Sequence, residues 1–299
     1  MDPEDLVKAL ASVPAIENLA SQIFEFVKHP ETAKGSLASE AIAQLSVDGY
    51  HPLGVALQYP QTLLINSADH LLLVGKTRKA FPQTTPVTPL PMVGFLSLAR
   101  VAIENSATAL WMVSDPSIRN LEQRAVQAHL EELGEYERYL RFRHPTECVD
   151  KLQGDDLVHT NPIWIEIFED LDLRRRKLEA FAKANGYRLS KLPSLVSSDP
   201  KQKGILEQVF GKSLEILYSQ LSGTTHGSTW GFGLNTKREE ITLDQLEGVS
   251  KSVNHSADPA FQDKVLAVAT SLLERAFNSY KSLFSLPAST GQQMPKIFN

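Results

Sequence analysis

The chain has 299 residues, 42% of them hydrophobic and 22% charged, and its 30 Lys and Arg against 35 Asp and Glu give a formal net charge of −5. This apolar content excludes a disordered chain and a collagen-like repeat, and the length allows one large domain or two modest ones. The negative charge argues against a protein that coats DNA or RNA, although a local basic patch is compatible with it.

Hydrophobic residues recur at steps of three and four along most of the chain, which predicts helices, and no convincing run alternates as a strand does. The helices expected in the first part of the chain cover residues 3–27, 37–45 and 61–81. His29-Pro30 ends the first of them, because a proline disfavours a helical residue before it. A passage rich in Gly and Pro, residues 49–60, precedes the third. We expect residues 1–60 to form an N-terminal helical element.

The second part of the chain begins with a proline-rich segment, residues 82–91, which cannot be helical and is interpreted as a stiff connection. The helices expected after it cover residues 92–113, 116–142, 162–184, 201–222 and 259–286. Irregular segments are expected at residues 144–160, 189–200 and 223–236. Roughly eight helices, unequal loops and no internal repeat predict an all-α protein, an irregular multi-helix bundle. The main bundle is expected over residues 61–286, followed by a frayed tail over 287–299.

The sequence contains no recognisable targeting or membrane signal. The first five residues are Met-Asp-Pro-Glu-Asp, whereas a secretory signal begins with basic residues followed by an apolar run. The most apolar predicted helix contains Arg100 and Glu104, whereas a membrane-spanning helix needs roughly 20 nearly uncharged residues. The single cysteine, Cys148, cannot form an internal disulfide or a structural zinc site. We therefore expect a soluble cytoplasmic protein without a membrane partner.

The helix predicted over residues 92–113 is the most informative segment, because it is apolar over most of its circumference and should lie centrally. Its polar residues fall on one narrow stripe: Ser97, Arg100, Glu104 and Thr108. Burying an arginine and a glutamate is costly unless both are paired and hydrogen-bonded. Two interpretations stay open. The stripe is either a buried structural ion pair, or a functional pocket that faces a ligand or another helix.

A second polar group lies at residues 218–227, with the sequence Tyr-Ser-Gln-Leu-Ser-Gly-Thr-Thr-His-Gly. Tyr218 and Ser222 are one helical turn apart, and Gly223 is expected to weaken or end the helix. His226 would then lie on a turn beside two threonine hydroxyls. There it could serve as a general base or a phosphate ligand, or it could simply cap the helix end through its ring N–H.

These two segments together resemble an uncharacterised actinobacterial group of helical proteins. The resemblance covers residues 65–235, and it is carried by Ala99 to Glu104, Trp111, Asp115-Pro116, Arg119 to Arg124 and the Tyr-x-x-Leu-Ser-Gly-x-x-His-Gly element. The group has no assigned reaction, so the resemblance implies that the two motifs meet but implies no activity. On this basis we expect Arg100 and Glu104 to lie beside Tyr218, Ser222 and His226.

A fainter similarity is to the HEPN helical ribonucleases and nucleotide-binding bundles, which pair an arginine with a histidine four to six residues further on. Arg124 with His129 and Arg138 with His144 match this spacing. However, residues five apart on a straight helix point away from each other, and His129 falls on the apolar face of its helix. His226 has no arginine at the required distance. The active-site motif of that family is therefore not carried over to this chain.

Other chemistries lack their signatures. The chain has no Glu-x-x-His pair, no His-Glu-x-x-His, no Walker loop and no Gly-x-Ser-x-Gly elbow, so we expect neither a metal nor a cofactor. His70 and His129 could each join the polar stripe, although an ordinary solvated or core histidine explains them as well. The basic run at residues 174–177 shares its helix with many acidic residues and is interpreted as a solvated face.

The motifs in the sequence leave two functions open. The first is a ligand-binding or protein-interaction module with a buried polar cluster, whose partner is a small molecule, a nucleotide or a second copy of the chain. The second is a hydrolase or HEPN-like ribonuclease acting on a phosphate-containing substrate such as RNA. In that case Arg100 would neutralise the anion, His226 would act as acid and base, and Glu104 would orient a partner. We favour the first, because no spacing here has the specificity of a nucleophile or metal motif.

Overall fold

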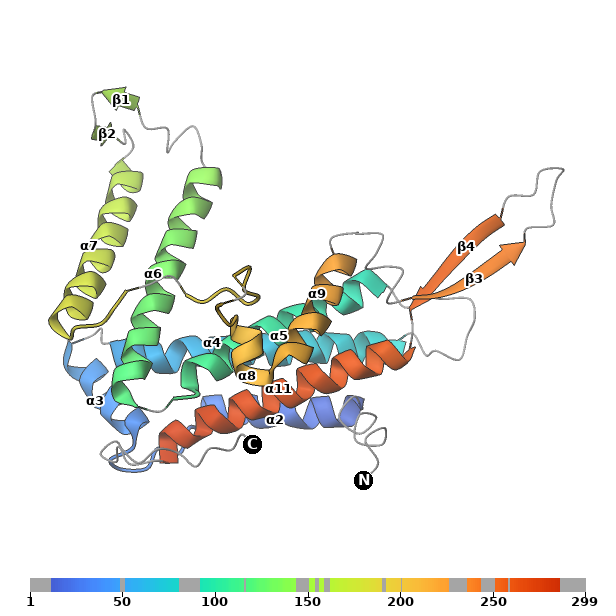
Figure 1. Ribbon diagram of the computed structural model, residues 1–299. Helices are drawn as coiled ribbons and strands as arrows, with labels where there is room; N and C mark the ends of the chain where they lie inside the picture. Colours follow the sequence, from blue (N-terminus) through green and yellow to red (C-terminus); the bar gives the residue numbers. More distant parts are fainter. Residues whose placement is uncertain are drawn as a thin grey trace. The chain divides into compact units, whose positions relative to one another are not determined.

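The computed structural model describes residues 12–48, 52–80, 92–115, 117–143, 151–153, 156–158, 162–189, 192–199, 201–225, 236–242, 251–257 and 259–285. These residues are mainly helical, which confirms the predicted all-α multi-helix bundle (Figure 1). The helices are α2 (Val13–Lys28), α3 (Leu37–Asp48), α4 (Pro52–Ala80), α5 (Met92–Val113), α6 (Ile118–Arg143), α7 (Pro162–Ala184), α8 (Ile205–Phe210), α9 (Lys212–Thr225) and α11 (Pro259–Ser285). The strands are β1 (Lys151–Gln153), β2 (Asp156–Val158), β3 (Thr236–Thr242) and β4 (Lys251–Ala257).

The chain divides into two compact units, and each combines segments that are not consecutive in the sequence. Among the described residues, the first unit takes those within Met1–Ser39, Tyr59–Ser114 and Pro193–Ser289. The second takes those within Glu40–Gln58, Asp115–Leu192 and Thr290–Asn299. The division expected from the sequence instead follows the order of the chain, with a boundary near residue 60.

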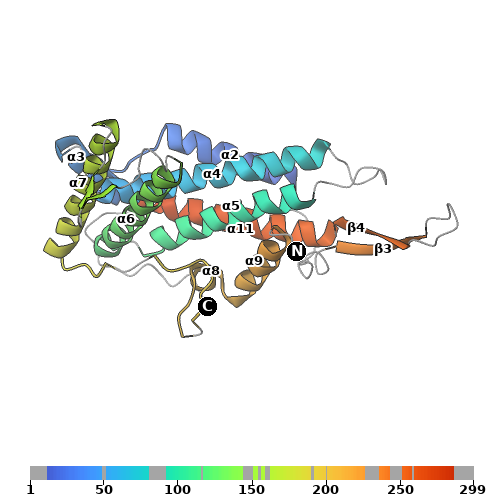
Figure 2. The same cartoon turned by 90° about the horizontal axis from the view of Figure 1, so that it is seen from above.

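The first unit is built around α5. Figures 1 and 2 show α2, α4, α5 and α11 running side by side, and α5 also packs against α8 and α9. Small and apolar residues of α5 are fully buried, among them Ala99, Ala102 and Ile103. Small side chains let neighbouring helices approach closely, and α5 makes its most extensive contact with α11. The central position predicted for this helix is therefore observed.

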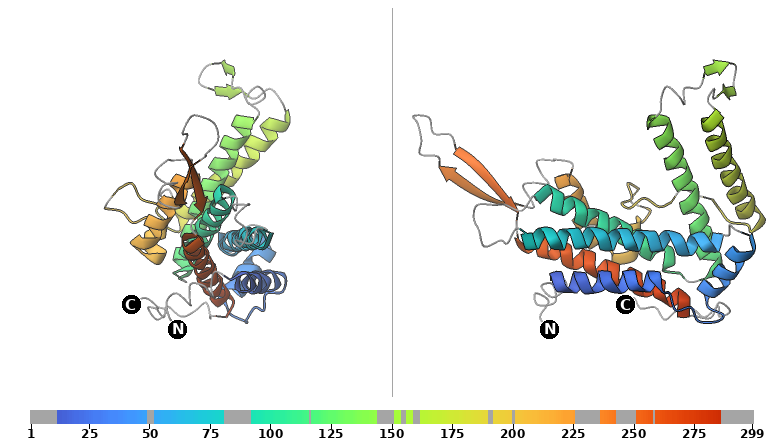
Figure 3. Two further views of the ribbon diagram at one scale, coloured as in Figure 1. Left: turned by 90° about the vertical axis from the view of Figure 1, so that its right-hand side faces the viewer. Right: turned by 180° about the vertical axis from the view of Figure 1, so that it is seen from behind.

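The second unit contains the antiparallel pair of α6 and α7, which lie side by side in both views of Figure 3. The residues buried between them are Val126, Leu133 and Leu140 of α6 with Trp164, Leu171, Leu178 and Ala182 of α7. On each helix these positions recur at steps of seven residues, apart from Ala182, which follows Leu178 by four. That spacing is the pattern of two helices packed along one seam.

The largest differences from the predicted helices concern α4 and the segment that contains α8 and α9. The helix expected over residues 61–81 after the Gly- and Pro-rich passage instead begins at Pro52 and continues through Pro60 to Ala80. Pro52 is tolerated because it is the first residue of the helix, where a missing N–H would have no helical partner. Pro60 lies inside the helix, where it removes one helical hydrogen bond, so the local sequence offers no reason to extend the helix across it. The helix expected over residues 201–222 is instead two helices, because Gly211 adopts a φ of +89° that no α-helix can contain.

Two antiparallel hairpins were not predicted. β1 pairs with β2 inside the segment expected to be a loop, and β3 pairs with β4 between α9 and α11. Three-residue strands are too short to show an alternating pattern. β3 carries four consecutive charged residues, Lys237 to Glu240, so its two faces do not differ in polarity. Within the described residues, no helix combines the length and the apolar composition that crossing a membrane requires.

Candidate functional site

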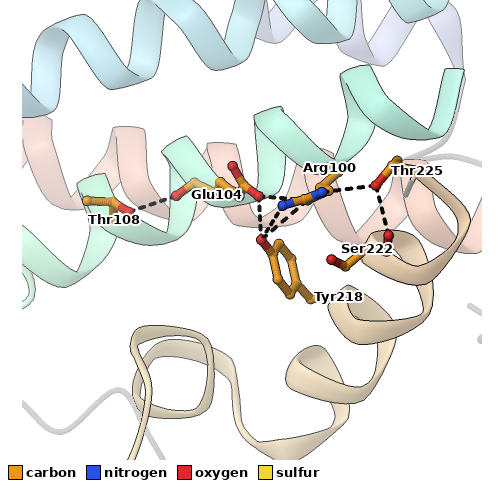
Figure 4. A network of polar contacts seen from close by, with 6 residues as sticks. All are labelled: Arg100, Glu104, Thr108, Tyr218, Ser222 and Thr225. Carbon is orange, nitrogen blue, oxygen red and sulfur yellow. Dashed lines mark hydrogen bonds and ion pairs between the residues drawn. The ribbon is translucent and has the colours of Figure 1, made fainter. Parts of the chain in front are cut away.

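Arg100 and Glu104 face the same side of α5, one turn apart, and form an ion pair in which Arg100 Nε donates to Glu104 Oε1 over 2.8 Å. Their side chains keep only 21% and 24% of their surface exposed, so the pair is neither solvated nor fully enclosed. One turn further, the Thr108 hydroxyl donates to the backbone carbonyl of Glu104 over 2.9 Å. Three residues of the predicted stripe, Arg100, Glu104 and Thr108, therefore form a polar edge on α5 (Figure 4).

Tyr218 of α9 completes the ion pair from the neighbouring helix. Its buried phenol donates a hydrogen bond to Glu104 Oε1 and accepts one from Arg100 Nη2 over 3.0 Å, with Arg100 Nε at 3.3 Å. The guanidinium carbon also lies 5.2 Å from the centre of the tyrosine ring, within the range of a cation–π contact. The hydroxyl of Tyr218 thus bridges the two charges on α5.

Thr225, the last residue of α9, makes the third contact with the guanidinium. Its hydroxyl accepts a hydrogen bond from Arg100 Nη1 over 2.9 Å and donates one to the backbone carbonyl of Ser222 over 3.0 Å. Figure 4 shows Arg100 between Glu104 and Tyr218 on one side and Thr225 on the other. We call Arg100, Glu104, Tyr218 and Thr225 the α5–α9 cluster.

The electrostatics of the cluster stabilise the arginine cation and the neutral phenol. Burial, reinforced by the Glu104 carboxylate, raises the pKa of Tyr218 to about 12, although Arg100 opposes the shift. Burial by itself lowers the pKa of Arg100, but the hydrogen bond to Tyr218 and the Glu104 carboxylate outweigh it, so the pKa of Arg100 is raised. The cluster therefore keeps the arginine charged and the tyrosine protonated at neutral pH.

The structure brings three of the five predicted site residues into direct contact. Arg100, Glu104 and Tyr218 touch one another, as the resemblance led us to expect. Ser222 takes part through its backbone carbonyl, which accepts the bond from Thr225. His226 lies outside the described residues. The catalytic role assigned to these residues stays a prediction.

His70 and His129, which could have joined the polar stripe, contact residues outside the α5–α9 cluster. His70 Nδ1 lies 2.6 Å from the backbone oxygen of Asn66, one turn earlier on α4. His129 belongs to the second unit, where its Nδ1 lies 3.5 Å from a carboxylate oxygen of Glu132. Burial lowers the pKa of His129, so the neutral ring is favoured.

The sequence analysis did not single out Thr225. Gly223 was expected to weaken or end the helix, but α9 continues to Thr225 and Gly223 is buried within it. Residues 218 and 225 are seven apart, so two full turns of helix place them on the same face. This heptad spacing is the signal that could have identified Thr225 as a partner of the arginine.

The cluster contains a single carboxylate and no other metal-binding side chain. In the part of the chain that the structure describes, no group of three or more His, Cys, Asp or Glu side chains could hold a metal ion. Comparison of the chain with protein-family models, curated proteins and solved structures gives no match. Function is therefore inferred from the geometry of the site.

Proposed function

We propose that the protein is a binding or interaction module in which the α5–α9 cluster positions α9 on α5. One observation carries this proposal: Arg100 directs its guanidinium to three protein partners, Glu104, Tyr218 and Thr225, which lie on two helices. An arginine that stabilises an anionic substrate has to offer its N–H groups and its charge to that substrate. In the cluster, Glu104 compensates the charge at 2.8 Å.

The end of α9 adds a second reason. The C-terminus of a helix carries a partial negative charge, so a cation placed there is favoured and an anion is disfavoured. Arg100 contacts α9 through its last residue, Thr225, and through Tyr218 two turns earlier. A phosphate at this point would meet both the helix end and the Glu104 carboxylate. We therefore do not expect a nucleotide to bind at the cluster, and a partner should dock elsewhere on the chain.

A hydrolase is the second candidate, because His226 directly follows Thr225, the cluster residue at the end of α9. Cleavage of a labelled single-stranded RNA and of a generic phosphodiester should be measured for the wild type and for His226→Ala. We expect no cleavage that this substitution abolishes. Cleavage that is lost in a His226→Ala variant with an unchanged melting temperature would overturn the proposed function.

The positioning role of the cluster is tested by Thr225→Val, which removes the hydroxyl and keeps the side-chain shape. Losing this bond to a charged group should cost about 1 kcal/mol locally, so amides in the last turn of α9 should exchange hydrogen about fivefold faster. The control is Thr77→Val in α4, whose hydroxyl donates only to the carbonyl one turn before it among the bonds described. Unchanged exchange in α9 of the Thr225 variant would contradict a positioning role.

Tyr218→Phe tests the bridge between the two charges and predicts a pH dependence. At pH 7 we expect the variant to be about 1–2 kcal/mol less stable, because the phenol bonds two charged groups. Since the pKa of Tyr218 is raised to about 12, its contribution is complete below about pH 10, the pKa of an unfolded tyrosine. This contribution is lost as the pH rises from about 10 to about 12. The free energies of unfolding of the variant and the wild type should therefore become more similar over that range.

Urea denaturation at pH 7 and between about pH 9 and 12 measures this difference. The matched control at pH 7 is Tyr280→Phe, because the buried phenol of Tyr280 lies 3.1 Å from a neutral partner, Gln61 Oε1. Its loss should be smaller, about 0.5–1 kcal/mol, since hydrogen bonds between neutral groups are weaker. A Tyr218 difference that stays constant up to pH 12 would argue against the buried, protonated phenol.

A further inference from the structure

A groove of about 870 Å³ lies along the α6–α7 pair of the second unit. None of the residues that line it belongs to the α5–α9 cluster. The floor of the groove consists of Leu133, Ile167 and Leu171, of which Leu133 and Leu171 belong to the buried seam between the two helices. On α6 the lining extends from His129 to Tyr139. Ten residues of helix rise about 15 Å, so the groove is long enough for about five residues of extended chain.

One wall of the groove is aromatic. Tyr136 and Tyr139 line it from α6, one turn apart, and they keep 47% and 55% of their surface exposed. Phe142, a further turn along the same helix, is 84% exposed. Exposed aromatic side chains in a row are a common feature of interaction surfaces, because their faces and edges offer large contact areas at little cost in conformational entropy.

The groove is also strongly acidic. Four carboxylates line it, Glu132, Glu135, Glu166 and Asp170, against a single arginine, Arg174. Arg174 pairs with Asp170 over 2.8 Å, and Arg138, which does not line the groove, pairs with Glu135 over 3.0 Å. Among the ion pairs described, Glu132 and Glu166 have no arginine or lysine partner, and burial favours the neutral form of His129 beside Glu132 by lowering its pKa. Carboxylates beside aromatic faces form the environment that attracts lysine and arginine side chains.

The same two helices already hold an arginine in this manner. The Arg141 guanidinium lies 4.9 Å from the centre of the Phe168 ring and donates to Glu137 over 3.1 Å. An aromatic face on α7 and a carboxylate on α6 thus bind a guanidinium between them. The groove repeats this pairing of aromatic and acidic side chains on a surface that is open to a partner.

From the charge and shape of this groove we propose that the α6–α7 pair docks a basic peptide segment of a partner protein, with its lysine or arginine side chains against Tyr136, Tyr139 and Glu166. A small organic cation fits less well, because small-molecule sites enclose most of their ligand and these walls are about half exposed. A second copy of the chain also fits less well. Its basic run on α7 is already paired within the chain, Arg175 with Glu137 and Arg176 with Asp172.

The test uses the full chain and a fluorescein-labelled octapeptide in which arginine alternates with serine. We expect saturable binding by fluorescence anisotropy that weakens with added salt, and no binding of the same peptide with glutamate in place of arginine. Tyr139→Ala and Glu166→Gln should each weaken binding about twofold to fivefold, and Glu132→Gln combined with both of them at least tenfold. Each glutamate substitution removes one charge, and Tyr139→Ala removes one ring. Because all three side chains are exposed, the variants should fold, which circular dichroism checks.

Glu169→Gln is the matched control, because Glu169 is exposed on the same helix but does not line the groove, and this variant should bind as the wild type does. Binding that the triple variant retains would overturn the proposal, as would the absence of binding. Spermidine that competes with the peptide at equal affinity would show a small-cation site instead. Self-association abolished by the triple variant would show an interface between copies.

The outcome is independent of the function proposed for the cluster. RNA cleavage that depends on His226 would overturn that function without affecting peptide binding at the groove. Failure of the peptide to bind would overturn the docking proposal and leave the α5–α9 cluster as it is.

Discussion

Replacing Arg100 by alanine is expected to lower the free energy of unfolding by about 2–4 kcal/mol. The substitution removes the hydrogen bonds to Glu104, Tyr218 and Thr225 and the contact with the tyrosine ring. It also leaves the Glu104 carboxylate, whose side chain is only 24% exposed, without its compensating cation. An uncompensated charge in a mostly buried position costs more than the loss of the pair itself.

Urea denaturation at neutral pH measures the loss, and two further variants define its origin. Lys79→Ala breaks an ion pair with Glu17 whose side chains are 56% and 44% exposed, so it should cost no more than about 1 kcal/mol. Adding Glu104→Gln to Arg100→Ala should restore part of the stability, because the amide oxygen still accepts from Tyr218 and the charge is gone. If the Arg100 variant is no less stable than the Lys79 variant, the cluster does not hold α9 on α5 as proposed.

Gly204→Ala is expected to destabilise the first unit by about 2–4 kcal/mol, because the new methyl group has no room. A Cβ at this buried position would lie 2.5 Å from the Leu195 carbonyl oxygen and 2.8 Å from the Ser197 nitrogen. The φ of Gly204 is −67°, which alanine adopts freely, so the cost comes from the close approach of the two segments. Backbone atoms, unlike the end of a long side chain, cannot turn aside.

The loop that the methyl group would displace also supports the start of α8. The carbonyls of Ser194 and Leu195 accept hydrogen bonds from the N–H groups of Ile205 and Leu206, over 3.0 and 3.2 Å. Helix N-termini leave such N–H groups without helical partners, so moving the loop exposes them. The control is Gly94→Ala in α5, where a Cβ would meet nothing within 4 Å. That change should leave stability unchanged or raise it by up to about 1 kcal/mol, and equal denaturation midpoints for both variants would refute the steric argument.

Which helices form could be predicted because helix periodicity is a local property. The bounds of α5 and α7 match the prediction, since Met92 follows a proline-rich segment and Asn185-Gly186 stops α7. The predictions were wrong where a residue's conformation depends on the surrounding fold. Pro60 lies inside α4, although a proline more often ends a helix, and Gly211 separates α8 from α9, although a glycine can also lie within a helix. The residues next to each of them in the sequence do not show which of the two outcomes occurs.

The residues of the candidate site could likewise be predicted only in part. Arg100 and Glu104 could be identified because two charged residues stand out in an apolar helix, and Tyr218 because it precedes a distinctive Gly-Thr-Thr-His-Gly segment. Their contact was expected only through a resemblance, because residues 114 positions apart share no periodicity. Thr225 was not singled out, since its role requires α9 to extend beyond Gly223.

The sequence alone therefore determined the helical class, the extent of the central helix and the polar stripe along it, because all three follow from spacings within a few turns. The tertiary structure decided which partners that stripe meets, that α6 and α7 form a groove with tyrosines and carboxylates on its walls, and which segments combine into each unit. These features depend on side chains brought together from distant parts of the chain. Packing of buried apolar surface fixes such contacts, and no local pattern encodes them.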